Sequence, residues 1–184
     1  CQFWYAFSNG FSGESIVESW TLTLYNVFFL VLPPFVIGIF DQYISANSLL
    51  QYPKLYELGQ NCYFFNVEIF WSWAVNGFYH SAIIYLAIIN IYKYGNVLPY
   101  GIVADHWVIG VTLYTVSLLT SLGKAALISS QWTKFTFIAI PGSFVLWLIA
   151  FPLYALIAPK VNVSKEYVGI IRYVYGSDVF WLTI

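Results

Sequence analysis

The chain contains 184 residues, of which 60% are hydrophobic, 22% are aromatic and only 8% are charged. A soluble domain carries about 25% charged residues and cannot bury so much apolar surface at this length, so the composition excludes a soluble globular protein and predicts an integral membrane protein. The formal net charge of −1 gives no electrostatic support for a nucleic acid or an acidic substrate as a partner.

Four segments are long and apolar enough to cross a bilayer as helices, which requires about 20 predominantly apolar residues each. In chain order they are Trp20 to Phe40, Ile69 to Tyr92, Trp107 to about Ile128, and Phe135 to Ala158. A partial span ends near Gly10, and another partial span begins near Val179. The sequence therefore predicts an all-α fold, a polytopic membrane helix bundle with four complete spans and two truncated ones.

The connections between the spans differ in length and character. The stretch "FSGESIVES" indicates a tight polar turn, "DQYISANSLLQYPKLYELGQNCYF" a long loop, and "SSQWTK" a hairpin between helices. Both chain ends lie inside apolar runs and methionine is absent, so we expect residues 1–184 to be an internal piece of a longer membrane protein. Lysine and arginine fall in the loops of both sides, so the positive-inside rule does not decide the orientation.

Two adjacent prolines, Pro33 and Pro34, stand at the centre of the first complete span. Because proline has no N–H, the carbonyls four residues earlier lose their helical partners. Inside a membrane, such carbonyls are tolerated only within protein or beside a wet cavity. The pair therefore predicts a kink, which either packs among neighbouring helices or lies beside a transport pathway. Pro141 and Pro152, in the last complete span, predict plain structural kinks.

Polar side chains inside or beside the spans are candidates for contact with a solute. Ser8 and Asn9 lie near the end of the first partial span and Asn26 lies within the next span, so the three flank the same short connection. Polar groups in a span cost free energy and usually face the bundle interior, where they either line a pathway or bond across helices. Asn76 and His80, one turn apart, are expected to bond across helices.

No acidic residue lies in the interior of any complete span. A desolvated metal cation would require carboxylate ligands, and a proton relay would require a chain of acids or histidines, so the spans favour a zwitterionic or polar cargo. The sequence contains no metal cluster, nucleotide-binding loop or nucleophile with an orienting base. Lys124, near the end of a span, is either an anchor that extends to the headgroup layer or part of an anionic-lipid site on the cytosolic side.

Three stretches of the chain are distinctive, namely "QFWYAFSNGFSGESIVESWTLTLYNVFFLVLPPFVIGIFDQ", "GKAALISSQWTKFTFIAIPGS" and "KEYVGIIRYVYGSDVFWLT". Together they resemble the C-terminal membrane region of phospholipid-transporting P-type ATPases, and above all the fungal Golgi type that moves phosphatidylserine. The likeness runs from one end of the chain to the other. It implies that residues 1–10 end the fifth of ten spans, that the complete helices are spans six to nine, and that the chain stops at the start of the tenth.

The resemblance also implies a function and site residues. Family members couple ATP hydrolysis, through an aspartyl-phosphate, to the movement of aminophospholipid from the exoplasmic to the cytosolic leaflet. The phosphorylated Asp and the sites for ATP and Mg²⁺ are expected outside this chain, so no catalytic residue is expected within it. Asn9 matches the span-five asparagine near the lipid headgroup, with Ser8 and Asn26 beside the same path. Lys124 takes the place of a lysine that helps to bind a regulatory phosphoinositide in fungal members.

The same resemblance implies an orientation and partners. Odd spans run from cytosol to lumen, which places Lys124 at the cytosolic face and Asn162 in the lumen. Asn162-Val163-Ser164 is a glycosylation sequon that could be used there, although such a sequence also arises by chance. We expect a two-span glycosylated accessory β-subunit and no nucleic acid partner. We expect a trans-Golgi or endosomal membrane, with the plasma membrane as the alternative.

Two other classes of transporter compete with a lipid flippase. A passive channel or an ion-coupled transporter would share the apolar spans, but the lack of intramembrane carboxylates argues against it. A cation-pumping P-type ATPase would need acidic ligands in its sixth span, and Trp20 to Phe40 contains none. The sequence therefore favours the membrane part of a phospholipid flippase.

Overall fold

The computed structural model describes residues 1–61, 63–93, 97–98, 102–161, 164–165 and 167–184. In chain order its elements are α1 (Gln2–Ser8), α2 (Ser19–Leu24), the π-helix η1 (Tyr25–Phe29), α3 (Leu32–Phe40), α4 (Ala46–Gln51), α5 (Leu55–Gln60), α6 (Val67–Lys93), β1 (Val97–Leu98), β2 (Ile102–Val103), α7 (His106–Ile128), α8 (Lys134–Ile157), α9 (Ile170–Tyr175) and α10 (Asp178–Thr183).

Four segments of the structure are long and apolar enough to cross a membrane. They are Ser19–Phe40, Val67–Lys93, His106–Ile128 and Lys134–Ile157. Each begins and ends within two residues of its predicted span, so the all-α polytopic bundle is confirmed. One short antiparallel pair of strands, β1 with β2, lies in the connection between α6 and α7.

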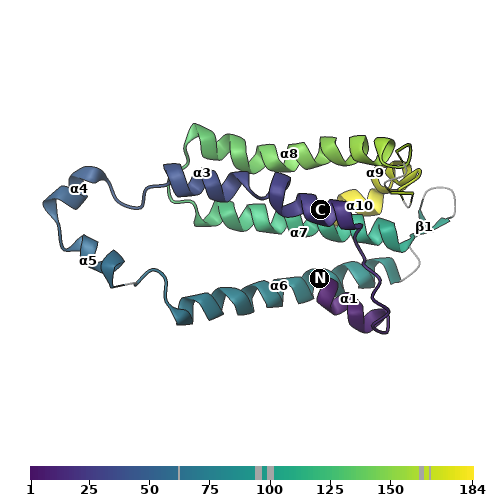
Figure 1. The fold of residues 1–184 in the computed structure, drawn as a ribbon, viewed down its shortest axis with the longest axis horizontal. Helices are drawn as coiled ribbons and strands as arrows, with labels where there is room; N and C mark the ends of the chain where they lie inside the picture. The colour runs from purple at the N-terminus through teal and green to yellow at the C-terminus, as the bar shows by residue number, and fades with distance from the viewer. Residues whose placement is uncertain (62, 94–96, 99–101, 162–163, 166) are drawn as a thin grey trace.

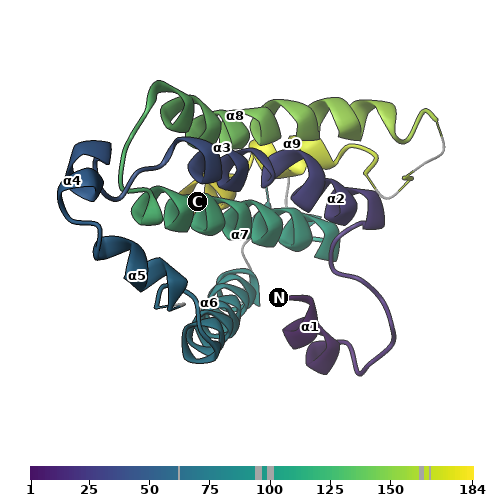
Figure 2. The same cartoon turned by 60° about the vertical axis from the view of Figure 1, so that its left-hand side comes forward.

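The long helices form one bundle, and the shorter elements lie around it (Figure 1). α3, α7 and α8 run side by side, while α6 packs against α7 and carries α1 on its surface. α9 and α10 pack against α7, and α9 also contacts α8. α4 and α5 project from one end of the bundle, as both views show (Figure 2). This arrangement brings α1, α6 and α7 together on one side.

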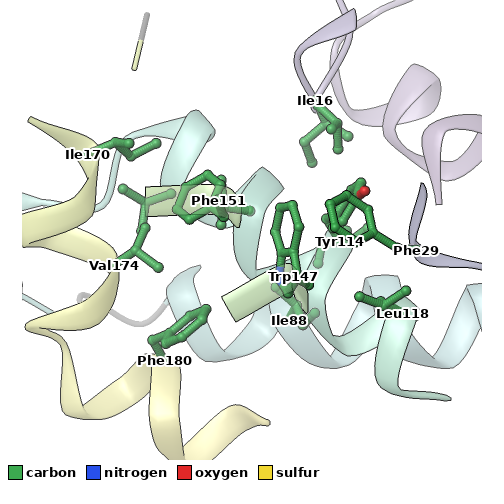
Figure 3. Packing of buried hydrophobic residues seen from close by; sticks show 14 of the residues in the cluster. Ile16, Phe29, Ile88, Tyr114, Leu118, Trp147, Phe151, Ile170, Val174 and Phe180 are labelled. Atoms are coloured by element: carbon green, nitrogen blue, oxygen red, sulfur yellow. The ribbon is translucent and has the colours of Figure 1, made fainter. Parts of the chain in front are cut away.

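The core is centred on Trp147 of α8, which is 2% exposed (Figure 3). The centroid of its ring lies 4.3 Å from that of Tyr114, 5.2 Å from that of Phe29 and 5.1 Å from that of Phe151. Its Nε1 donates a 3.0 Å hydrogen bond to Thr115 Oγ1. A buried indole needs such an acceptor, so this contact fixes how α8 packs on α7.

The first complete span consists of two helical halves. α2 continues into the five-residue π-helix η1, and the helix is then interrupted at Leu30 and Val31 before α3 begins. Pro33 and Pro34 stand in the first turn of α3, where their missing N–H groups have no intrahelical acceptor to lose. Pro33 is buried, whereas Pro34 is exposed on the surface of the bundle.

Prolines in the last complete span have a different outcome. Pro141 and Pro152 both lie inside α8, which is a single continuous helix from Lys134 to Ile157. A lone proline in a long membrane helix is tolerated when neighbouring groups satisfy the freed carbonyl. Among the prolines of the four described spans, the adjacent pair Pro33 and Pro34 alone coincides with an interruption of the helix.

Candidate functional site

α1 is attached to α6 through polar side chains. Ser8 Oγ and Tyr85 OH lie 2.6 Å apart, and Trp4 Nε1 donates to Ser81 Oγ at 3.1 Å. Tyr85 is 4% exposed, so its hydroxyl needs a partner and Ser8 provides one. The hydroxyl of Ser8, a predicted path residue, is therefore used in this structure to attach α1 to α6.

Asn9, the second predicted path residue, forms the C-cap of α1 and shapes the turn that follows. Its Nδ2 donates to the Glu14 carbonyl at 3.1 Å, and its Oδ1 accepts from the Phe11 N–H at 3.1 Å. Phe11 has a φ of 60° and Gly13 a φ of 80°, so the chain turns sharply here. Through these two hydrogen bonds, the half-buried Asn9 side chain stabilises the turn formed by residues 9–14.

Asn26, the third predicted path residue, lies apart from the other two. It stands in η1 and is exposed, and its side chain has no hydrogen bond within the described part of the chain. η1 packs on α8, whereas α1 packs on α6. The structure therefore brings Ser8 and Asn9 to one place and leaves Asn26 on another surface.

Lys124 lies one turn before the end of α7 and points into a cavity between helices. Its Nζ donates to Asn76 Oδ1 of α6, so the two helices are joined there. The cavity has a volume of about 250 Å³. Among its lining residues are Lys124, His80, Ser81, Ser117, Thr120 and Ser121. An ammonium surrounded by hydroxyl groups suits an anionic or strongly polar guest.

Within the described part of the chain, one of the two polar residues expected to bond across helices does so. Asn76 reaches Lys124 on α7, as the sequence predicted. His80 Nδ1 instead lies 2.9 Å from the Asn76 carbonyl of its own helix. Its ring nevertheless lines the same cavity as Lys124.

The segment "FSGESIVES" is not the plain polar turn that its sequence indicates. Ile16 is 2% and Val17 6% exposed, so both pack into the core beside α7. Gly110 of α7 allows this approach, because a Cβ at that position would lie 2.0 Å from the Ile16 carbonyl oxygen. The apolar pair inside the polar stretch was the signal in the sequence that this connection is buried.

Glu18, the second-last residue of that segment, is a buried carboxylate. It is 8% exposed and forms the N-cap of α2. Its Oε2 accepts from the Thr21 N–H at 2.8 Å, from Thr21 Oγ1 at 3.0 Å and from Tyr154 OH at 3.2 Å. An acidic residue directly before an apolar run is a typical N-cap, which was the available signal.

Thr21 extends this polar network to two further elements. Its Oγ1 lies 3.3 Å from Tyr167 OH, in the connection before α9, and its carbonyl accepts from Tyr114 OH of α7 at 3.2 Å. Thr21 and Tyr167 are both almost fully buried, so these groups have few alternative partners. The start of α2 is therefore attached to α7, to α8 and to the chain before α9.

The opposite end of the same span is attached through Asp41, the C-cap of α3. Its Oδ1 accepts from the Gln131 N–H at 2.7 Å and from the Ser130 N–H at 3.1 Å. Nearby, the rings of Phe40 and Phe135 stack with centroids 4.5 Å apart. The hairpin between α7 and α8 is thereby fixed to the end of α3, a contact that the sequence did not reveal.

Two further features bear on metal and modification sites. Within residues 1–61, 63–93, 97–98, 102–161, 164–165 and 167–184, no group of three His, Cys, Asp or Glu side chains is placed to hold a metal ion. Asn162, the predicted glycosylation site, lies outside the described residues.

Comparisons with known proteins give a consistent result. The family model described as "Phospholipid-translocating P-type ATPase C-terminal" matches residues 1–184. The chain is 59% identical over 184 residues to phospholipid-transporting ATPase DRS2 of Saccharomyces cerevisiae, covering all of the chain and 14% of that protein. It is 55% identical over 183 residues to phospholipid-transporting ATPase C887.12 of Schizosaccharomyces pombe, again with 14% of the relative covered. A human relative, phospholipid-transporting ATPase VB, is 36% identical over 152 residues, which are 83% of the chain and 10% of that protein.

Proposed function

Since this chain belongs to the phospholipid-translocating P-type ATPases, whose C-terminal model covers all 184 residues, we propose that the intact protein is an ATP-driven phospholipid flippase. The chain spans 14% of the length of its two fungal relatives, so the catalytic machinery belongs to the rest of the protein. The match over the whole chain is the observation that carries this proposal.

The helices of the chain correspond to the second half of a ten-span membrane domain. In this assignment α1 is the end of span five, the broken helix α2–η1–α3 is span six, and α6, α7 and α8 are spans seven, eight and nine. α9 and α10 then lead into and begin span ten. The antiparallel order of the long helices and the short α7–α8 hairpin support this reading (Figure 1).

The cargo is an aminophospholipid, in particular phosphatidylserine, moved from the exoplasmic to the cytosolic leaflet. The uncharged interior of the broken span supports a lipid cargo, because a cation pump needs carboxylate ligands there. The interruption at Leu30 and Val31 gives that span an irregular backbone, which membranes tolerate beside protein or a polar cavity.

Ser8, Asn9 and Asn26 are the residues of this chain that we assign to the lipid path. Asn9 is the strongest of the three, because its amide could exchange its bond to the Glu14 carbonyl for one to a headgroup. Asn26 offers an amide without a partner in the described part of the chain. Ser8 contributes by holding α1 on Tyr85.

The remaining assignments concern cofactors, regulation and location. ATP and Mg²⁺ bind to parts of the intact enzyme outside this chain, and a two-span glycosylated β-subunit accompanies it.

Lys124 contributes to a regulatory phosphoinositide site on the cytosolic side, which the ammonium and hydroxyl groups of its cavity support. Asn162 lies on the lumenal side, where it can be glycosylated. The membrane is that of the trans-Golgi or endosome, with the plasma membrane as the alternative.

One experiment tests the class of cargo. ATP hydrolysis by the intact protein is measured against a panel of phospholipids and a panel of metal cations. We expect stimulation by phosphatidylserine and none by cations. Stimulation by a cation alone would contradict the proposal, and so would transport that needs no ATP, as expected of a passive channel or an ion-coupled transporter.

A second experiment tests the assignment of Asn9. The change Asn9→Ala is expected to weaken the stimulation by phosphatidylserine while the protein still assembles. Asn90→Ala is the matched control, because Asn90 is exposed on α6 and its amide donates to the Leu86 carbonyl of the same helix. An unchanged lipid response in Asn9→Ala removes this residue from the path.

A further inference from the structure

His106, the first residue of α7, carries a buried nitrogen that has no partner. Its side chain is 33% exposed, but within the described part of the chain its Nε2 atom is buried and makes no hydrogen bond. Its Nδ1 lies 3.3 Å from Oδ1 of Asp105. An ionised carboxylate only accepts hydrogen bonds, so it favours a neutral ring with the proton on Nδ1. In that state Nε2 is a buried acceptor without a donor, which costs free energy.

A carboxylate lies close to this nitrogen. Oε1 of Glu14, in the connection between α1 and α2, is 3.6 Å from Nε2 of His106. This distance is slightly too long for a hydrogen bond, and a neutral Nε2 has no proton to donate. A proton on Nε2 turns this acceptor into a donor. A movement of roughly 0.5 Å then brings the two atoms to the distance of a charge-assisted hydrogen bond.

The other neighbours of the ring also favour a charged histidine. Each ring nitrogen has a carboxylate beside it, Asp105 at Nδ1 and Glu14 at Nε2. The centroid of the Trp107 ring lies 4.3 Å from that of His106, and indole rings attract cations at such distances. Histidine is the side chain whose charge ordinarily changes between pH 5 and 8. The contacts at this end of α7 therefore depend on pH within the physiological range.

The elements that surround this end of α7 carry further titratable groups. Lys93 of α6, Arg172 of α9 and Asp178 of α10 are exposed, whereas Glu18 before α2, Tyr154 of α8 and Tyr167 before α9 are buried or half-buried. Water and salt screen the exposed charges. The three buried groups already bond within the network around Thr21. In the described part of the chain, the ion-pair contacts of the His106 ring are those with Glu14 and Asp105.

Glu14 connects this ring to the proposed lipid path. Its side chain lies beside His106, and its carbonyl accepts from the Asn9 amide at 3.1 Å. Residues 11–14 are exposed, whereas Ile16 is already buried against α7. A bond between Glu14 and His106 would therefore attach the exposed part of the connection to α7 and hold the carbonyl that Asn9 uses. Loss of that bond would leave the Asn9 amide free to exchange its partner.

We propose that protonation of His106 is a pH-sensitive switch, which attaches the turn of residues 9–14 to α7 through Glu14 and keeps the Asn9 amide occupied. The inference rests on the proposed flippase function and adds regulation of that path by pH. His106 begins α7 and Lys124 lies near its end, so a cytosolic Lys124 places His106 on the lumenal side. The acidic lumen of an endosomal compartment then favours attachment of the turn, and a neutral medium favours its release.

Hydrogen exchange of the intact protein in detergent tests the attachment. The amides of residues 9–15 are followed by mass spectrometry at about pH 5.5 and about pH 7.5, on either side of the ordinary titration of histidine. Each variant is compared with the unaltered protein at the same pH, because the intrinsic exchange rate itself depends on pH. The test variants are His106→Gln, which stays neutral, and Glu14→Gln. The matched controls are His80→Gln and Glu68→Gln, both on α6.

At about pH 5.5 we expect the turn to exchange about two- to fivefold more slowly in the unaltered protein than in either test variant, the effect of one ion pair at a partly exposed site. At about pH 7.5 the unaltered protein and the test variants exchange alike. The two controls follow the unaltered protein at both pH values. Equal exchange of the unaltered protein and His106→Gln at the lower pH overturns the inference. So does a difference of the same size at both pH values, because the side chain then acts without its charge.

Stimulation of ATP hydrolysis by phosphatidylserine tests the link to Asn9. Between the higher and the lower pH, the lipid concentration for half-stimulation should rise about two- to fivefold more in the unaltered protein than in His106→Gln. The same pH dependence in both proteins overturns the link. If exchange behaves as expected but no lipid stimulates hydrolysis at either pH, the switch stands and the flippase proposal fails. If lipid stimulates hydrolysis but exchange does not differ, the switch fails and the flippase proposal stands.

Discussion

The two ends of the broken span are both held by a carboxylate, in two different ways. Glu18, at the start of α2, is 8% exposed and accepts from Thr21 and from the Tyr154 hydroxyl of another helix. Asp41, at the end of α3, is only half-buried and accepts from two backbone N–H groups of one turn. Water can replace the donors of Asp41 but not those of Glu18. The first end should therefore be rigid and the second adjustable.

This difference in rigidity agrees with the different functions that we propose for the two ends of the span. The Glu18 end follows the connection that Asn9 organises, and fixed geometry there would help Asn9 in its proposed role in the lipid path. The Asp41 end adjoins the α7–α8 hairpin, one turn beyond Lys124, where a regulatory lipid would act. The hydrogen bonds between the half-exposed Asp41 carboxylate and the backbone amides of the hairpin can break when such a ligand binds.

The largest effect is expected from Gly110→Ala, because the added Cβ would lie 2.0 Å from the Ile16 carbonyl oxygen. The segment before α2 must then move away from α7, at a cost of about 3 kcal/mol. A glutamate-specific protease should cut more readily after Glu14 in this variant. Gly123→Ala, on the same helix with nothing within 4 Å of its Cβ, is the control and should be cut like the unaltered protein. Equal cutting of both variants would show that the segment is not fixed at Gly110.

Glu18→Ala should have the next largest effect. It removes the N-cap of α2 and leaves the Tyr154 hydroxyl without its acceptor, which lowers the free energy of unfolding by about 2 kcal/mol. The melting temperature of the intact protein in detergent measures the loss. Glu18→Gln should lose less because its amide oxygen still accepts, and Glu68→Ala should lose nothing. Identical melting of all three variants would contradict a rigid Glu18 end.

Asp41→Ala should cost about 1 kcal/mol, since water can replace the lost acceptor for the Ser130 and Gln131 amides. The same melting experiment measures it, with Glu57→Ala on the exposed helix α5 as the control. Hydrogen exchange at residues 130 and 131 should become faster in Asp41→Ala. A loss as large as that of Glu18→Ala would remove the distinction between the two ends.

Lys124→Ala should change stability least, by about 0.5 kcal/mol, because only a solvent-exposed hydrogen bond to Asn76 is lost. Its effect should be functional: activation of ATP hydrolysis by an anionic phosphoinositide should require more lipid. Lys134→Ala, an exposed lysine at the start of α8, is the matched control. If the activation curve of Lys124→Ala coincides with that of the control, Lys124 is only an anchor between helices.

The spans were predictable from the sequence, whereas their attachments were not. A membrane helix is specified locally, by about 20 apolar residues in a row, and the predicted limits agree with the structure within two residues. The partners of the two carboxylates are remote: Tyr154 lies 136 positions from Glu18, and Ser130 lies 89 positions from Asp41. A single sequence does not indicate such pairs, because they depend on how the helices pack.

The effect of the prolines on the helices could not be predicted from the sequence either. Pro33 and Pro34 coincide with an interrupted helix, while Pro141 and Pro152 lie in a continuous one. Residue type alone did not distinguish these outcomes. Among the polar residues, Ser8 and Asn9 lie together as the sequence suggested, but Asn26 lies on a surface of its own because η1 packs on α8. Which side chains come into contact depends on which helix faces pack together, and a single sequence does not determine that packing.

The most direct test of the account is the movement of lipid itself. The intact protein is placed in vesicles with labelled phosphatidylserine, and the amount in each leaflet is followed with and without ATP. We expect ATP to drive the lipid from the exoplasmic to the cytosolic leaflet, and we expect Asn9→Ala to slow this movement while Asn90→Ala does not. A distribution of lipid that ATP leaves unchanged, together with ATP-driven uptake of a cation, would contradict it.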